Sequence, residues 1–126
     1  MSKIIYGTLR ECVDELWKII EENDYTYCPR VDYAASVDED AEDEKEAYES
    51  AEGWFGFKDY GDDFNADTIS LCFGHYSGGG VAAMEIDPDC GDNQKEILMN
   101  TIGYSTDQCG YGVLEPNDKT VFEIYD

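Results

Sequence analysis

Hydrophobic residues recur at helical spacing near the start of the chain, at Leu9, Val13, Leu16 and Ile20. Such spacing places one apolar stripe along a helix, while acidic residues and Lys18 fill the other side. Thr8 precedes the stripe and Glu11 follows three residues later, which is the spacing of an N-terminal capping box. The pattern predicts an amphipathic helix from about 9 to 22, preceded by a short strand at 3–6.

Shorter apolar runs bounded by glycine, proline and asparagine predict β-strands further along the chain. One strand is expected at about 31–35. The run TISLCFGHY at 68–76 and the residues 81–86 flank the turn sequence SGGG, so they are expected to pair as a hairpin. A second hairpin is expected from 113–114 and 120–125, across a Pro-Asn-Asp turn.

Helical spacing returns at 94–102, where Gly103 is expected to end a short helix before a loop at 104–112. The whole pattern predicts an α+β fold, an antiparallel sheet of four to five strands with two to three helices. With 126 residues, the chain has enough length for one modest core, so a single domain over 1–126 is expected.

Charge changes the picture, because the chain carries 30 acidic residues against 8 basic ones and a formal net charge of -22. Hydrophobic residues still make up 42% of it and aromatic ones 13%, which separates it from disordered acidic tails. So large a negative charge repels nucleic acid and anionic membranes and attracts basic surfaces. The expected partner is therefore a basic protein, with no direct nucleic-acid or membrane binding.

The densest charge lies at 38–52, called here the acidic segment, where nine carboxylates accompany a single base, Lys45. A thin apolar stripe predicts a helix from about 39 to 52, capped by Asp38, stopped by Gly53 and followed by a loop to residue 64. Repulsion along such a helix would cost about 2–4 kcal/mol. Its charges would be spaced roughly 2.5 Å apart, near the ~1.7 Å of duplex DNA. The segment thus indicates mimicry of a nucleic-acid backbone.

Two sets of acidic residues are the candidate partner-binding residues. The first set lies in the acidic segment and consists of Glu39, Asp40, Asp43, Glu46 and Glu49. The second follows it and consists of Asp62, Asp63 and Asp67.

No motif indicates an enzyme, a cofactor or a metal centre. His75 and Cys72 are three apart in an expected strand, so their side chains would point to opposite faces and not form a catalytic dyad. The acidic run from Asp87 to Glu96 departs from calcium-loop spacing, because position 5 is glycine and position 12 is leucine. The five cysteines lack CxxC spacing and no secretory signal is evident, so a cytoplasmic location is expected.

Two stretches, EGWFGFKDYGDDF at 52–64 and VFEIYD at 121–126, are similar to ArdA-type antirestriction proteins. In size, acidity and absence of catalytic motifs the chain resembles the DNA-mimic inhibitors that phages and mobile elements make against restriction and CRISPR enzymes. The resemblance implies that acidic side chains occupy the arginine and lysine sites of a CRISPR-Cas effector or a restriction nuclease.

The leading hypothesis is therefore a non-enzymatic, anti-CRISPR type of inhibitor that occludes a basic nucleic-acid cleft. An immunity protein that neutralises a basic nuclease toxin would need the same charge, and gene neighbourhood would separate the two. A third alternative is an acidic domain that binds divalent cations or is adapted for solubility. A titration with Ca²⁺ would test the cation version.

Overall fold

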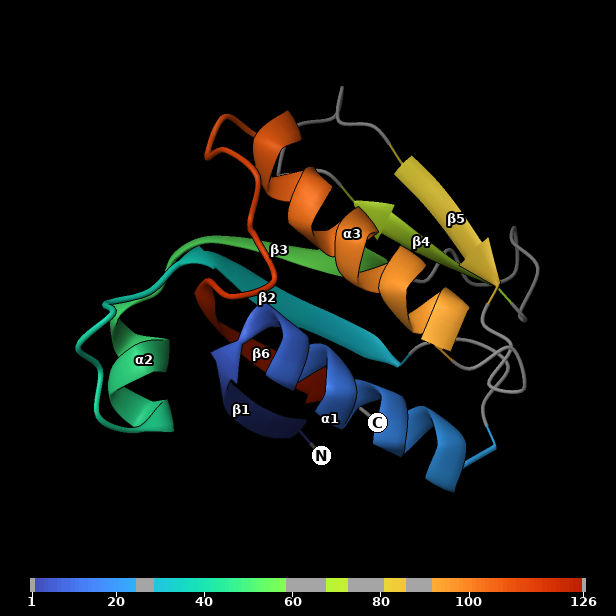
Figure 1. Cartoon of the computed structure of the whole chain (residues 1–126), viewed down its shortest axis with the longest axis horizontal. Helices are drawn as coiled ribbons and strands as arrows, with labels where there is room; N and C mark the ends of the chain where they lie inside the picture. The colour runs from blue at the N-terminus through green and yellow to red at the C-terminus, as the bar shows by residue number, and fades with distance from the viewer. Residues whose placement is uncertain (1, 25–28, 59–67, 73–80, 86–91, 126) are drawn as a thin grey trace.

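The computed structural model describes residues 2–24, 29–58, 68–72, 81–85 and 92–125, with 57–58, 68–72 and 81–85 described as backbone only. Figure 1 shows how the helices and strands are arranged. Their order is β1 (Ser2–Thr8), α1 (Leu9–Glu22), β2 (Arg30–Ser36), α2 (Glu44–Ser50), β3 (Glu52–Lys58), β4 (Thr68–Cys72), β5 (Val81–Glu85), α3 (Asp92–Gln108) and β6 (Lys119–Tyr125).

The strands form one six-stranded sheet in the order β1-β6-β2-β3-β4-β5, and every neighbouring pair is antiparallel. The last strand, β6, lies between β1 and β2, so both ends of the chain meet in the sheet. The α+β class and the antiparallel sheet are confirmed. The number of helices, three, agrees with the expectation, and the sheet has one strand more than the expected maximum of five. The helix at 9–22, the strands at 3–6 and 31–35 and the pairing of 68–72 with 81–85 are also confirmed.

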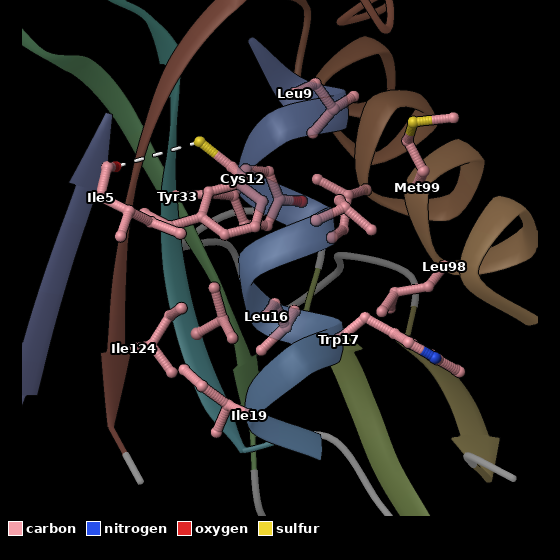
Figure 2. Packing of buried hydrophobic residues seen from close by; sticks show 14 of the residues in the cluster. Ile5, Leu9, Cys12, Leu16, Trp17, Ile19, Tyr33, Leu98, Met99 and Ile124 are labelled. Atoms are coloured by element: carbon pink, nitrogen blue, oxygen red, sulfur yellow. Dashed lines mark hydrogen bonds between the residues drawn. The ribbon is translucent and has the colours of Figure 1, made fainter. Parts of the chain in front are cut away.

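The main core lies between the sheet and the layer formed by α1 and α3 (Figure 2). The apolar stripe of α1 is almost wholly buried, and Tyr33, Phe122 and Ile124 of the central strands are 0% exposed. Leu98, Met99 and Ile102 of α3 complete this core. At roughly 1.5–3 kcal/mol for each buried large apolar side chain, this layer is the main source of stability.

A second, smaller core lies on the other face of the sheet, because side chains alternate between faces along a strand. Ala34 follows Tyr33 in β2, and Val121 precedes Phe122 in β6, so both point away from α1 and α3. Ala47 of α2 packs on them, and all three are 0% exposed. The acidic segment is therefore held on the face opposite the main helix layer.

Gly103 does not end α3, which runs on to Gln108 and includes part of the expected loop at 104–112. A Cβ at Gly103 would lie 2.3 Å from the carbonyl oxygen of Leu114. The glycine thus allows close approach of the chain between α3 and β6. A sequence pattern does not distinguish this use of glycine from a helix stop.

Two expectations about strands are wrong. Residues 52–58 form β3, where the end of a helix and a loop were expected, because Trp54 and Phe55 supply side chains to opposite faces of the sheet. Residues 113–114 form no strand, and 120–125 belong to β6, which pairs with β1 and β2 instead of forming a hairpin. Both errors arise from long-range pairing that local turn signals do not encode.

Candidate partner-binding surface

The acidic segment is a turn followed by a short helix, so the expected helix over 39–52 is confirmed only for residues 44–50 and is wrong in its length. α2 has seven residues, Glu44–Ser50, and spans only about 10 Å. The Asp38 carboxylate accepts a hydrogen bond from the Asp40 amide at 3.0 Å, and the Ala41 amide donates to the Asp38 carbonyl at 3.1 Å. Aspartate side chains compete in this way with helical hydrogen bonds, and like-charge repulsion adds to the effect.

Asp43, and not Asp38, is the N-cap of α2. Its carboxylate accepts a hydrogen bond from the Glu46 amide at 2.8 Å. The Glu46 carboxylate in turn accepts from the Glu42 amide at 3.0 Å, which closes a variant of the capping box one residue early. Two of the candidate residues, Asp43 and Glu46, therefore hold the backbone of the segment in place.

Tyr48 connects α2 to the sheet. Its ring packs on Trp54 of β3 with centroids 5.0 Å apart. A hydrogen bond from its hydroxyl to the Glu123 carboxylate raises the pKa of Tyr48. Tyr125 donates a second hydrogen bond to the same carboxylate. These contacts, with the buried Ala47, fix the position of α2 against β6 and β3.

Most of the remaining acidic side chains of this segment face solvent and form no described ion pair. Glu39, Asp40 and Glu49 are exposed, and so are three further glutamates that sequence reasoning did not select, Glu42, Glu44 and Glu52. Among the side chains that the structure describes, none of these six carboxylates accepts a hydrogen bond or forms an ion pair. The second candidate set, Asp62, Asp63 and Asp67, lies outside the described residues.

The ion pairs of the described side chains are all found elsewhere in the fold. Arg10 contacts Glu96 at 2.9 Å and Lys95 contacts Asp14 at 3.2 Å, which joins α1 to α3. The other pairs are Lys3–Glu15 at 3.8 Å, Lys18–Glu15 at 2.9 Å, Lys95–Asp92 at 3.8 Å and Arg30–Asp32 at 3.3 Å. The bases in these pairs therefore contact acids of α1, α3 and β2, and none of them contacts a carboxylate of the acidic segment.

A groove of about 480 Å³ lies next to the acidic segment, and sequence reasoning did not anticipate it. It brings together side chains of β1, α1 and the first residue of α2, and their sequence positions give no sign that they meet. The lining residues are Lys3, Ile5, Tyr6, Glu11, Cys12, Asp14, Glu15, Lys18 and Glu44.

No group of three or more His, Cys, Asp or Glu side chains arranged to hold a metal ion occurs in the part of the chain that the structure describes. His75 and most of the acidic run from Asp87 to Glu96 lie outside that part. In the same part, no helix is long and apolar enough to cross a membrane.

Comparisons with protein-family models, curated proteins and solved structures find no match to this chain. The similarity to DNA-mimic inhibitors therefore stays a prediction.

Proposed function

We propose that this chain is a non-enzymatic inhibitor that binds the basic nucleic-acid cleft of a nuclease through its acidic segment. One observation carries the proposal, namely that every ion pair among the described side chains lies outside that segment. Exposed carboxylates without counter-charges fit lysine and arginine side chains that otherwise hold phosphates.

The short helix changes how the mimicry works. The described charges do not lie along one straight helix. The segment would therefore match duplex DNA in local charge density and not in the regular spacing of its charges. The turn at 38–43 and α2 hold the carboxylates of Glu39, Asp40 and Glu49 on a fixed backbone. A preorganised surface loses less conformational entropy on binding than a flexible acidic tail does.

The nuclease proposed first is a defence enzyme, a CRISPR-Cas effector or a restriction nuclease, which the chain would inhibit by competing with nucleic acid. The test is a cleavage assay with a purified CRISPR effector, a restriction nuclease and a basic nuclease toxin, each titrated with the chain. We expect inhibition of a defence enzyme that weakens as salt or competing DNA is raised. Inhibition of the toxin alone would instead identify an immunity protein.

The variant for this assay reverses Glu39, Asp40 and Glu49 to Lys, because these side chains make no described contact that the fold needs. Reversal of Asp43 or Glu46 would also remove the cap of α2. A loss of inhibition by such a variant could then come from a change in folding instead of a loss of binding. The matched control reverses Glu21, Glu22 and Asp107, three exposed acids in α1 and α3, and changes the net charge equally. If the two variants inhibit equally well, the acidic segment is not the binding surface. If the parent chain inhibits none of the three nucleases, the proposed function is wrong.

A further inference from the structure

The groove beside β1 is formed at an edge of the sheet. β1 is the terminal strand, so β6 pairs with one side of it and no described strand pairs with the other. An unpaired strand edge presents backbone N–H and C=O groups that can accept another strand. β1 is seven residues long, contains no proline and carries Ile4, Ile5 and Tyr6 at its centre.

The two sides of this edge are lined by different helices. Side chains of α1 approach β1 from the main core, and Cys12 of α1 donates a long hydrogen bond to the Ile5 carbonyl at 3.9 Å (Figure 2). Glu44 of α2 lines the groove from the opposite face of the sheet. An added strand would therefore lie between the two helices, with side chains directed towards both.

The charges of the lining residues decide what kind of strand fits. Four carboxylates line the groove with two lysines, and both lysines already contact Glu15. Asp14 contacts Lys95, whereas Glu11 and Glu44 form no ion pair with any described side chain. An incoming cationic side chain would meet these two carboxylates on either side of β1.

A second copy of the chain is a poor occupant. Two β1 strands placed side by side would bring two copies of Glu11 and Glu44 into one groove, where like charges repel. The net charge of -22 on each copy adds to that repulsion. The acidic lining thus protects the edge from self-association and selects an occupant of opposite charge.

We propose that β1 takes an extended basic segment of the partner protein as an added strand, with lysine or arginine side chains directed at Glu44 and Glu11. Main-chain hydrogen bonds would supply affinity, and the flanking carboxylates would supply the preference for a basic sequence. This inference rests on the proposed function for its partner, but the surface itself can be tested without a nuclease.

The probe is a seven-residue peptide, Lys-Val-Lys-Val-Lys-Val-Lys, compared with the same peptide N-methylated at alternate residues. N-methylation keeps the charge but removes the strand hydrogen bonds. We expect saturable binding of the first peptide, slower hydrogen exchange at β1 amides, and at least about tenfold weaker binding of the second. Equal affinity for the two peptides, or unchanged exchange in β1, would overturn the added strand.

The matched variants are Glu44→Lys, inside the groove, and Glu21→Lys, an exposed acid of α1 outside the groove and outside the acidic segment. We expect Glu44→Lys to weaken peptide binding about fivefold more than Glu21→Lys does. Equal weakening, or dimerisation through β1 in size-exclusion experiments, would contradict the proposal. Inhibition of a nuclease that survives Glu44→Lys but not the triple reversal would reject docking at β1 and leave the proposed function standing. Peptide binding at β1 without inhibition of any nuclease would support the added strand and reject the proposed function.

Discussion

Gly103 of α3 lies directly against Leu114, where the Leu114 amide donates a hydrogen bond to the Gly103 carbonyl at 3.0 Å. Thr106 strengthens this contact, because its hydroxyl donates to the same Gly103 carbonyl at 2.8 Å and accepts from the Leu114 amide at 3.0 Å. The chain leaving α3 is thereby held against the helix before it enters β6. Close backbone contact of this kind leaves no room for a side chain.

Gly103→Ala should therefore destabilise the protein, although alanine favours helix by about 1 kcal/mol. Its Cβ would lie 2.3 Å from the Leu114 carbonyl oxygen, and overpacking of this kind costs about 1–3 kcal/mol or more. Urea denaturation should show a net loss of stability. Asn100→Ala, on the exposed part of α3, is the control and should be neutral or stabilising. A gain in stability for Gly103→Ala would contradict the close contact.

The capping box of α1 should make stability depend on pH in the acid range. The backbone and side chain of Thr8 donate hydrogen bonds to the Glu11 carboxylate, which lowers the pKa of Glu11. Because the folded pKa is lowered, this contribution is present above the ordinary glutamate pKa and is lost as pH falls below it. Glu11→Gln removes the titrating carboxyl, so it should lower the free energy of unfolding at pH 7 and change it less at pH 3, measured by urea denaturation. An equal cost at both pH values would contradict this linkage.

Cys12 should be unreactive in the folded protein. Burial raises the pKa of its thiol to about 12, so the nucleophilic thiolate is scarce at neutral pH. Iodoacetamide labelling followed by peptide mass spectrometry should modify Cys12 only after denaturant is added. Rapid modification of Cys12 under native conditions would show that the packing of α1 against β1 and β6 does not shield the thiol.

The same thiol should reduce stability in alkaline solution. Since its folded pKa lies above its unfolded one, the stabilising contribution is complete below about pH 9 and declines as pH rises. Between pH 8 and 10 the parent chain should lose about 1 kcal/mol more stability than Cys12→Ala does. Parallel stability curves for the two proteins would exclude this effect.

Asp43 should stabilise α2 through its cap and not through its charge. Asp43→Ala removes the acceptor for the Glu46 amide and should cost about 1 kcal/mol, whereas Asp43→Asn keeps an acceptor and should cost much less. Hydrogen exchange at the Glu46 amide reports the difference directly. If the two variants exchange equally fast, the cap does not stabilise the helix.

The exposed carboxylates of the acidic segment should oppose folding at low salt. Neutralising Glu39, Asp40 and Glu49 to their amides should raise the melting temperature by about 3 °C, because like-charge repulsion falls. Added sodium chloride should raise the melting temperature of the parent more than that of the variant. A variant less stable than the parent would show that these carboxylates make stabilising contacts.

Local sequence patterns predicted the elements whose stability comes from their own residues. α1 follows from an apolar stripe and from the pair Thr8 and Glu11. The pairing of β4 with β5 follows from two short apolar runs on either side of the sequence SGGG. In the acidic segment, the sequence was sufficient to identify the excess of charge. It did not separate Asp43 and Glu46, which hold the backbone, from Glu39, Asp40 and Glu49, which face solvent.

The sequence by itself determined an amphipathic first helix, an α+β composition and a strongly acidic surface, because periodicity and charge are local properties. Only the tertiary structure decided that β6 inserts between β1 and β2 and that β1 is left at an edge beside Glu44. It also decided that α3 continues through Gly103 and that the described ion pairs form outside the acidic segment. These outcomes depend on contacts between residues far apart in the chain, where pairing and close packing outweigh local turn and helix preferences.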